Sequence, residues 1–408
     1  MQKLFEIHSK FLSRMVDLAC GCLDKAPNQQ PNSPDQYLVI KPSAKNHVLE
    51  FVFSTSRIAI VVRVDDAADF IKIHETGVFV VKGDVLRSLL KQATAEKMTV
   101  GFDSGPAGGN LICSFPNAVE KEEWTFPCID PTSLDLTVSP KIDLGDERQF
   151  KISNINDFSR CLVSVGMAVG KDAGNPTYRN VLVRTKAEGL DIVSSNIGHL
   201  AFGKTKYETA TGNFHFVTPY EQLLTFAKLL DAELPAVFVH NNGEPGTVVV
   251  MQEVKYGSDK PLGRVFLRTS CATEPFVQFD ATIKKLEAKL TNQCKADVTQ
   301  FVGVCQRLAL LQPPETKVVW NKEKEALVFS KQEAGRGTTK GIALPVKDMV
   351  GKEKFDLVLS SIVLKMIADK ATDEETEIEW LFGEPTDFAC IRFSTNLKTY
   401  FSPFKEMT

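Results

Sequence analysis

The sequence predicts an α+β protein in which antiparallel sheets carry their helices on one face. Three observations support this fold class. A pattern of strand, helix and strand pair recurs six times along the 408 residues. Each recurring helix has one apolar stripe, and the strands around it alternate apolar and polar residues. Hydrophobic residues make up 43% and charged residues 24% of the chain, which is the balance of an ordinary folded protein.

The six copies of the repeat differ in sequence but keep the same pattern. They begin near residues 4, 78, 149, 214, 289 and 354. A unit that cannot bury its apolar face alone needs a neighbour, so we assign two units to each domain. The sequence therefore predicts three similar domains built from β-α-β-β units, spanning residues 1–144, 145–280 and 281–408.

Each predicted helix has apolar residues at positions i, i+3, i+4 and i+7, the pattern of a helix with a single buried face. The six stripes are Leu12, Met15, Val16 and Ala19; Leu86, Leu89, Leu90 and Ala93; Phe158, Cys161, Leu162 and Val165; Tyr220, Leu223, Leu224 and Ala227; Val298, Phe301, Val302 and Cys305; and Leu359, Ile362, Val363 and Met366. The strands of each unit are expected to cover these stripes.

Hairpins are predicted where turn residues separate alternating segments. The turns lie at Ala187–Gly189, Asn321–Lys324 and Gly383–Pro385. The segment GPAGG (105–109) is also glycine-rich, but it lacks the Lys-Ser/Thr and the following helix of a phosphate-binding loop. We therefore predict a hairpin loop there as well.

Composition excludes several classes of protein. No apolar run approaches the ~20 residues of a membrane span, and the N-terminus has no signal-peptide core, so we expect neither secretion nor membrane insertion. The nine cysteines include no C-x-x-C pair, which favours reduced thiols in a cytoplasmic protein and no structural zinc site. The net charge is −3, so any contact with nucleic acid must come from local patterning.

Basic residues recur on the helix surfaces opposite or beside the apolar stripes. They are Lys10, Arg14, Arg87, Lys91, Arg160, Lys171, Arg307 and Lys365. On one helix alone such a face is more often solvated surface, and Asp17 and Glu221 interrupt the pattern. Its recurrence on most of the six units favours contact with a phosphate backbone, which is independent of sequence and weakened by salt. No helix-turn-helix, zinc finger or RNA-binding sheet is evident, so we expect non-specific binding of duplex DNA.

Three segments resemble a known family. NPTYRNVLVRTKAEGLDIVSSNIGHLAFGK is similar to a segment in which a Pro-x-Leu-x-Gly-Val strand leads to a Thr-Asp-Gly-His-Arg-Leu-Ala turn. FLRTSCATEPFVQF is similar to a segment ending in Phe-Pro-Asp-Tyr, and TYFSPFKEMT to an ending with Pro-Met-Arg-Leu. On these segments the chain resembles the bacterial β-type sliding clamps, the DNA polymerase III beta subunits, over nearly all its length. The turn reads SNIGHLA here, and the tail runs past the usual end, which fits a divergent member such as a phage-encoded one.

The resemblance implies a head-to-tail ring, usually a homodimer, in which edge strands of the first and third domains pair across subunits. Such a ring encircles duplex DNA and acts as a processivity factor for DNA replication. Its partners would be the replicative DNA polymerase and the clamp loader, each bound through a short peptide. The expected location is the bacterial cytoplasm, or the cytoplasm of the host if a phage encodes the protein.

The resemblance also implies a hydrophobic groove for partner peptides between the middle and last domains. Carried over residue by residue, its walls are Tyr178, Ser195, His199, Leu200, Pro275, Phe279, Tyr400, Phe401, Pro403 and Phe404. The alternative is that the tail aromatics pack into the core of the last domain. For Tyr400 the two interpretations are equally good, whereas the position of Phe404 near the chain end favours the groove.

Two other functions compete with this prediction. The six histidines fall in no catalytic or metal-ligand motif, so we expect no enzyme, no catalytic residues, no metal and no cofactor. A repeat scaffold that forms rings or shells without DNA would explain the repeats and the tail. It would leave the recurring basic residues without a role.

Overall fold

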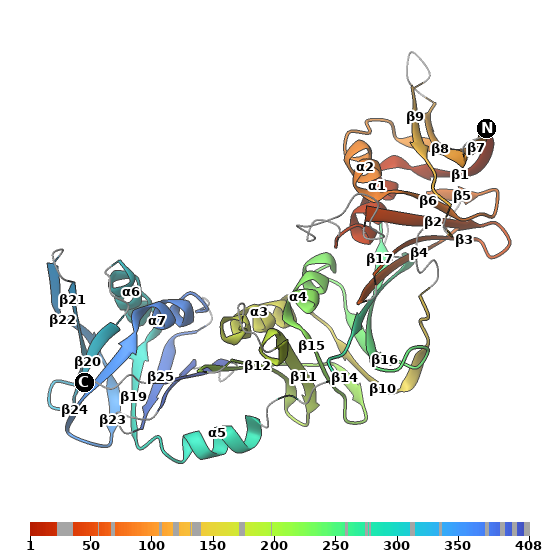
Figure 1. Ribbon diagram of the computed structural model, residues 1–408. Coiled ribbons are helices and arrows are strands. Elements are labelled where there is room, and N and C mark those ends of the chain that lie inside the picture. Colours follow the sequence, from red (N-terminus) through yellow and green to blue (C-terminus); the bar gives the residue numbers. More distant parts are fainter. Residues whose placement is uncertain are drawn as a thin grey trace. The chain divides into compact units, whose positions relative to one another are not determined.

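The structure is a computed structural model, shown in Figure 1. It describes residues 1–403 apart from 23–35, 56, 67–69, 106–107, 117–121, 131, 133–139, 171–175, 197, 258–259, 274–275, 277–278, 311–314, 334–336, 372–374, 384–387 and 394–397.

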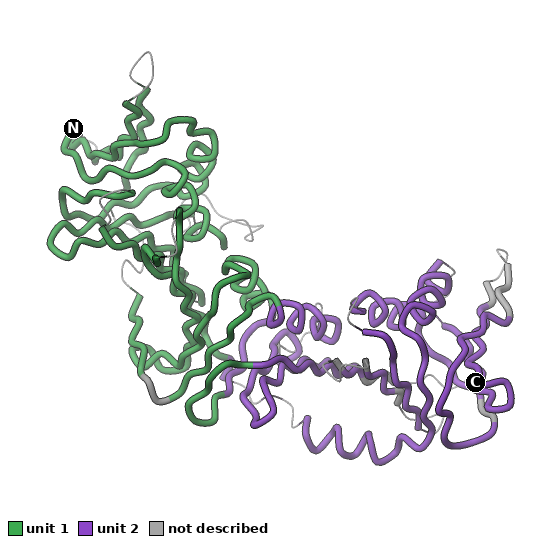
Figure 2. Tube along the Cα trace, turned by 180° about the vertical axis from the view of Figure 1, so that it is seen from behind, with its two compact units in different colours: residues 1–156, 207–214, 221–271 green, residues 157–206, 215–220, 272–408 purple. Residues whose placement is uncertain are grey.

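The chain forms two compact units, coloured separately in Figure 2. The first contains Met1–Asn156, Tyr207–Phe214 and Glu221–Cys271, and the second contains Asp157–Lys206, His215–Tyr220 and Ala272–Thr408. Residues of the predicted middle domain are shared between them. The predicted boundary at residue 280 falls inside a helix, α5 (Phe279–Glu287).

The first unit has a five-stranded sheet and a nine-stranded sheet, which we call the first large sheet; neighbouring strands in both are antiparallel where their pairing is described. In spatial order the five-stranded sheet is β5 (Ile71–Ile73), β1 (Gln2–His8), β7 (Lys97–Gly105), β8 (Gly108–Phe115) and β9 (Glu122–Pro127). The first large sheet is β14 (Thr209–Thr211), β10 (Leu144–Ile152), β16 (Ala236–Asn241), β17 (Thr247–Lys255), β18 (Pro261–Ser270), β4 (Ile58–Asp65), β3 (Val48–Ser54), β2 (Tyr37–Ser43) and β6 (Phe79–Lys82).

Helices α1 (Ser9–Ala19) and α2 (Gly83–Leu90) pack against each other in the first unit. Helix α1 also contacts strands of both sheets, because its stripe of Leu12, Met15 and Val16 is buried. Most of α4 (Tyr220–Leu229) belongs to the same unit. The predicted stripes of these helices are largely buried, as the helical period requires.

The second unit has a second large sheet of nine strands and a four-stranded sheet. The second large sheet is β15 (His215–Pro219), β11 (Asn180–Lys186), β12 (Gly189–Ser195), β13 (Leu200–Thr205), β27 (Lys398–Pro403), β26 (Phe388–Phe393), β25 (Glu377–Phe382), β19 (Asn292–Asp297) and β23 (Lys347–Val350). The four-stranded sheet is β22 (Gly337–Pro345), β21 (Ala326–Glu333), β20 (Glu315–Asn321) and β24 (Lys354–Ser360).

Helices α3 (Ile155–Val165), α5, α6 (Val298–Ala309) and α7 (Ser361–Ala368) accompany these sheets, with short 3-10 turns η4 (Gly166–Ala168) and η5 (Pro176–Arg179). Helices α6 and α7 pack together. The side chain of Asp297 caps α6 by accepting a hydrogen bond from the Gln300 amide, and Ser360 caps α7 through the Val363 amide.

The structure confirms the α+β fold class, the six helices of the repeats and the predicted hairpins. Strand pairs β11–β12, β20–β21, β25–β26 and β7–β8 flank the predicted turns, of which residues 106–107 and 384–385 lie outside the described residues. Each large sheet joins strands from different predicted domains through one strand pair, β4–β18 in the first unit and β13–β27 in the second.

Two helix predictions need correction. The stripe predicted for the last helix is wrong, because Leu359 belongs to β24 while Ile362 and Met366 are exposed. The buried face consists of Ser361, Leu364, Ile367 and Ala368. The segment SIVLKMIA is apolar at nearly every position, so periodicity alone could not select its buried face.

Helix α5 was not predicted, and it is the exception to the one-face arrangement. Along β13, Gly203 faces the Cys161 side chain of α3, whereas Leu200 packs in one apolar cluster with Phe279 of α5. Successive residues of a strand point to opposite faces. Helix α5 therefore lies on the opposite face of the second large sheet from α3.

Candidate nucleic-acid interface and peptide groove

In the first unit, four of the predicted DNA-contacting residues lie on the paired helices α1 and α2 or at the end of α2. Lys10 is exposed and has no acidic partner among the described residues. Arg14 is half-buried, and its guanidinium donates to the Lys255 carbonyl at 2.9 Å and to Asp231 at 3.1 Å. The guanidinium of Arg14 is thus bound to groups of its own unit.

Asp17 of α1 takes up more of that charge. Its carboxylate accepts a hydrogen bond from Arg87 Nε at 2.6 Å and lies 3.6 Å from Lys91 Nζ. These ion pairs join α1 to α2, and they leave a smaller net positive charge than the count of basic residues indicates. Because all three side chains are partly exposed, the pairs are weak and salt-sensitive.

In the second unit, Arg160 and Arg307 are exposed on α3 and α6. Arg307 Nε donates to the Gly303 carbonyl of its own helix at 3.1 Å. Lys365 of α7 pairs with Asp369 at 2.5 Å, one turn further along. Lys171 lies outside the described residues. The predicted DNA contacts stay predictions, and of those that the structure describes Lys10, Lys91, Arg160 and Arg307 are exposed.

The predicted groove begins at the turn between β12 and β13. The Asn196 side-chain oxygen accepts hydrogen bonds from the Gly198 and His199 amides at 3.0 and 2.8 Å. This local turn, formed because an Asn side chain can mimic a backbone acceptor, sets Ser195 directly opposite Leu200. Tyr178, in η5, is half-buried in the same unit.

His199 is half-buried, and burial lowers the pKa of its imidazole below the ordinary 6.5. A lowered pKa keeps the ring neutral at neutral pH. Its Nδ1 is buried and has no hydrogen-bond partner among the described protein groups. The ring is thus an uncharged polar group at the predicted wall.

The tail forms β27, which lies between β13 and β26 in the second large sheet. Tyr400 is 1% exposed, and its hydroxyl donates to the Ser164 carbonyl at 3.4 Å. Tyr400 is therefore a core residue, and its assignment to the groove wall is corrected. The backbone of Phe401 pairs with Leu200 and Cys390, and that of Pro403 with Phe388. Pro275 and Phe404 lie outside the described residues.

Leu200 and Phe279 do come together, in an apolar cluster between the second large sheet and α5. The cluster comprises Leu182, Val193, Leu200, Phe279 and Cys390, with Phe202, Val217, Phe276, Ile283, Leu286, Leu290 and Leu381 packed around it. Sequence analysis missed α5, although the spacing of Phe279, Ile283, Leu286 and Leu290 is helical. Its position next to a predicted domain boundary hid that signal.

A cavity of about 910 Å³ opens beside this cluster. Arg184 of β11 and Arg392 of β26 lie in its lining and hold the two ends of α5. Arg184 donates to both oxygens of Asp280 at 2.6 and 2.7 Å and lies 4.2 Å over the Phe279 ring. Arg392 pairs with Glu287 at 3.1 Å. These contacts fix the helix on the sheet.

The carboxylates around Arg184 differ in their titration. Hydrogen bonds from Arg184 lower the pKa of exposed Asp280. Asp191 also pairs with Arg184, at 3.0 Å. Burial nevertheless raises the pKa of Asp191, because the loss of hydration exceeds its attraction to a shared guanidinium.

Sites of other classes are not evident in the part of the chain that the structure describes. Among those residues no group of three or more His, Cys, Asp or Glu side chains could hold a metal ion. None of the described helices is long and apolar enough to span a membrane.

The fold is an α+β arrangement of helices packed on antiparallel sheets. Solved structures that share it over the whole chain include bacterial DNA polymerase sliding clamps. The sliding clamp of Bacillus subtilis is 14% identical, with 100% of both chains covered and a TM-score of 0.81. The beta subunit of DNA polymerase III from Thermotoga maritima is 12% identical with a TM-score of 0.76, and that from Pseudomonas aeruginosa is 11% identical with a TM-score of 0.78; each match covers 99% of this chain and 100% of the other.

No family model and no curated protein matches this sequence. The fold predicted from the resemblance is nevertheless confirmed: the chain has the architecture of the DNA polymerase III beta sliding clamps. At such low identity the likeness shows the fold, and function must be argued from the residues.

Proposed function

We propose that this protein is a DNA sliding clamp, a non-enzymatic processivity factor that encircles duplex DNA and tethers a replicative polymerase. The observation that carries the proposal is the clamp architecture over the full chain. A closed ring holds DNA by topological linkage, so it needs only weak contacts with the phosphate backbone.

The exposed basic residues fit this weak contact. Lys10 and Arg307 are exposed and form no ion pair among the described residues, Arg160 is exposed as well, and Arg87 and Lys91 share Asp17. Partial neutralisation lowers affinity without preventing sliding, because phosphate contacts are independent of sequence. The proposal therefore predicts low affinity for short linear DNA and strong retention on circles.

Ring closure is supported by the sheet edges. Strand β9 ends the five-stranded sheet and β22 ends the four-stranded sheet, so each has one side without a strand partner among the described residues. Leu310, directly after α6, is 83% exposed. An edge strand and an exposed leucine are liabilities in a monomer and are covered in a head-to-tail ring.

The peptide groove is assigned to the second unit, around Leu200 and Phe279 with Tyr178, Ser195 and His199. Leu200 and Phe279 are themselves buried, so a few apolar anchors of a partner peptide, the usual source of affinity in such grooves, would pack at the edge of their cluster. Phe401, Pro403 and Phe404 are assigned to the wall because the C-terminal segment resembles that of the bacterial sliding clamps.

The decisive experiment compares circular and linear DNA. The protein is incubated with nicked circular plasmid and passed through gel filtration in salt high enough to remove charge-dependent contacts. Protein that stays with the circle and is lost after a single restriction cut supports encirclement. Equal loss from circular and linear plasmid would overturn it, and sedimentation of the free protein gives the number of subunits.

The internal ion pairs of Arg14, Arg87, Lys91 and Lys365 favour one alternative, a ring-forming scaffold without DNA. The same plasmid experiment separates the two functions. A scaffold sediments as a ring but is never retained on circular DNA.

The groove is tested separately with the Phe404→Ala variant and a fluorescent C-terminal peptide of a replicative polymerase. Loss of one aromatic anchor typically costs about 2 kcal/mol, or roughly thirtyfold in affinity. Deletion from Phe401 onward is unsuitable, because it removes backbone pairs to Leu200 and Cys390. Unchanged peptide affinity in a folded variant would place Phe404 outside the groove.

A further inference from the structure

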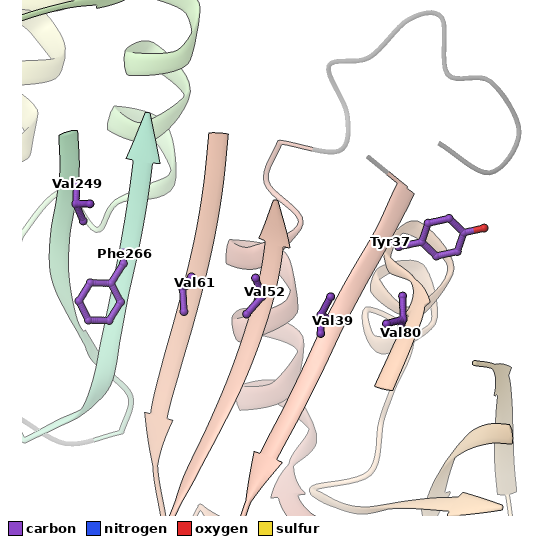
Figure 3. Packing of buried hydrophobic residues seen from close by; sticks show 7 residues of the cluster. All are labelled: Tyr37, Val39, Val52, Val61, Val80, Val249 and Phe266. Carbon is purple, nitrogen blue, oxygen red and sulfur yellow. The ribbon is translucent and has the colours of Figure 1, made fainter. Parts of the chain in front are cut away.

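The first large sheet carries two parallel rows of side chains on one face. Figure 3 draws Val80, Val39, Val52, Val61 and Phe266 of the apolar row, with α1 behind the strands. The first row is apolar and runs across neighbouring strands. It consists of Val80, Val39, Val52, Val61, Phe266 and Met251, each directly opposite the next. Directly opposite residues share a face, so the row forms one continuous apolar strip.

The second row lies two residues further along each strand, on the same face, and every member is charged. It consists of Lys41, Glu50, Arg63, Arg264 and Glu253, again each directly opposite the next. Arg63 and Arg264 are thus like charges in direct cross-strand register. Such a pair destabilises a sheet unless an anion offsets it.

The acidic groups of the row do not offset this pair fully. Glu50 accepts hydrogen bonds from Arg63 at 2.6 and 2.9 Å and pairs with Lys41 at 3.0 Å. Burial opposes ionisation of Glu50, but these hydrogen bonds together lower its pKa. Arg264 is exposed, and no described acidic group lies within ion-pair distance of its guanidinium.

A hollow lies where the two rows meet. A cavity of about 400 Å³ has Val52, Val61 and Phe266 in its floor and Ile142 and Leu144 at its side, with Arg63 and Arg264 in its rim. A second cavity of about 280 Å³ shares Arg63, Arg264 and Phe266 with the first. Arg63, Arg264 and Phe266 therefore line both hollows, and the lining of the second also includes Asp65 and Glu253.

We propose that this face is a docking site for an acidic peptide of a partner protein, separate from the groove in the second unit. One apolar side chain of the peptide enters the hollow over Val61 and Phe266. A neighbouring Asp or Glu carboxylate lies between Arg63 and Arg264 and offsets their repulsion. Charge complementarity selects this occupant, because Arg264 has no ion-pair partner among the described residues and the floor is apolar.

A nucleic acid fits this site less well. Phosphate would meet the guanidiniums, but it offers nothing apolar for the floor. Of the basic residues predicted to contact DNA, Lys10 and Arg14 lie on α1, which packs on the far side of the strands from this face. Duplex DNA is therefore an outcome to be tested against the peptide.

The test uses the full chain with isotope-labelled Ile, Leu and Val methyl groups. The probe is the peptide Ac-Glu-Leu-Phe-Glu-NH2, with Ac-Gln-Leu-Phe-Gln-NH2 and Ac-Glu-Ser-Ser-Glu-NH2 as controls. We expect saturable shifts of the Val61, Ile142 and Leu144 methyl signals with the first peptide and much weaker ones with either control. Shifts confined to Leu200 and Leu286 would locate binding in the second unit and overturn the proposal, whatever the outcome for the clamp function.

Variants make the test specific. Arg264→Gln should weaken binding at Val61 about tenfold or more, as expected for loss of a hydrogen bond between charged groups. Arg57→Gln is the matched control, since Arg57 is an exposed arginine of the same unit that lines neither cavity. Equal affinity in Arg264→Gln and the parent, or shifts at these methyls with a DNA duplex and none with the peptide, would overturn the proposal.

Discussion

The two large sheets cover the same kind of apolar face in different ways. In the first unit the cover comes from Ile129, Ile142 and Leu144, which include extended chain before and at the start of β10. In the second unit it comes from helix α5, which buries Phe279. A helix presents several side chains at i, i+4 and i+7 to one surface, whereas an extended segment contributes fewer. Cavities lie beside both covers, of about 400 Å³ in the first unit and about 910 Å³ in the second.

The charged groups beside each cover differ in the same sense. Arg184 and Arg392 of the second unit pair with Asp280 and Glu287 of α5 and hold both ends of the helix. In the first unit Arg264 has no such partner among the described residues. On the second large sheet the arginines form ion pairs with the covering helix. On the first large sheet the Arg264 guanidinium forms no such pair among the described residues, and we propose it for ligand binding. Four predictions test this difference.

The largest effect is expected for Phe279→Ala in the second unit. Phe279 is 3% exposed, and removal of a buried phenylalanine typically costs about 3 kcal/mol or more. Ile142→Ala in the first unit should cost only about 1 kcal/mol, because Ile142 is half-buried at the hollow. Urea unfolding, followed by amide exchange in β12 and β3, measures both. Equal costs would remove the proposed difference between the two covers.

The next effect comes from Arg184→Met, which leaves Asp191 buried without its cation. The expected loss is about 2 kcal/mol, below the range for fully buried pairs because Asp280 is largely exposed. Adding Asp191→Asn should recover much of the loss, since the buried charge is then gone. The same measurement on single and double variants gives the coupling. A double variant no more stable than Arg184→Met would show that stacking on Phe279 dominates.

A smaller effect concerns pH. Glu50 has a folded pKa below its usual 4.5, so its contribution to stability is present above 4.5 and is lost as pH falls through the folded value. Asp191 has a folded pKa above its usual 3.8, so its charge costs stability at neutral pH, and that cost is relieved as pH falls.

Relative to the parent, Glu50→Gln should therefore destabilise the protein most at neutral pH and progressively less in acid. Asp191→Asn should be more stable than the parent at neutral pH, and this gain in stability should shrink as pH falls. Thermal unfolding of the parent and both variants across this range measures the two slopes. Slopes of the same sign would contradict the assignment of these two carboxylates.

The smallest effect is expected for the helix face of the first unit. Lys10→Gln should reduce the salt slope of DNA binding by about one, because Lys10 has no acidic partner among the described residues. Arg87→Gln should reduce it by less, since Arg87 already pairs with Asp17. Binding of a fluorescent duplex at several salt concentrations is the measurement. Equal slopes for the two variants would mean that the Asp17 pair opens whenever DNA is bound.

Periodicity was a good guide where polar and apolar positions alternate clearly. Phe158, Cys161 and Leu162 on α3 are buried as predicted, because a polar residue interrupts each turn of that helix. The same reasoning failed for α7, where Ile362 and Met366 are apolar yet exposed. It also missed α5, although its apolar residues fit one helix face. This helix belongs to none of the six repeat units, so the repeat pattern did not indicate it.

The candidate groove shows the same division. Ser195 and Leu200, which are close in sequence, lie opposite each other because a turn joins β12 to β13. Tyr400 was undecided, since an aromatic residue near a chain end suits a core and a groove equally well. Its burial follows from the pairing of β27 with β13 and β26, a contact between segments about 200 residues apart.

The sequence by itself determined the repeats, the hairpins and most buried helix faces, because these depend on side-chain period and turn chemistry within a few residues. Only the tertiary structure decided which strands join the large sheets, which face α5 covers and which basic residues form ion pairs. Those outcomes depend on register between distant strands and on acidic groups such as Asp17 and Asp280 that meet their partners only after folding. Contact across a fold, and not composition, therefore sets the surfaces that are left for a ligand.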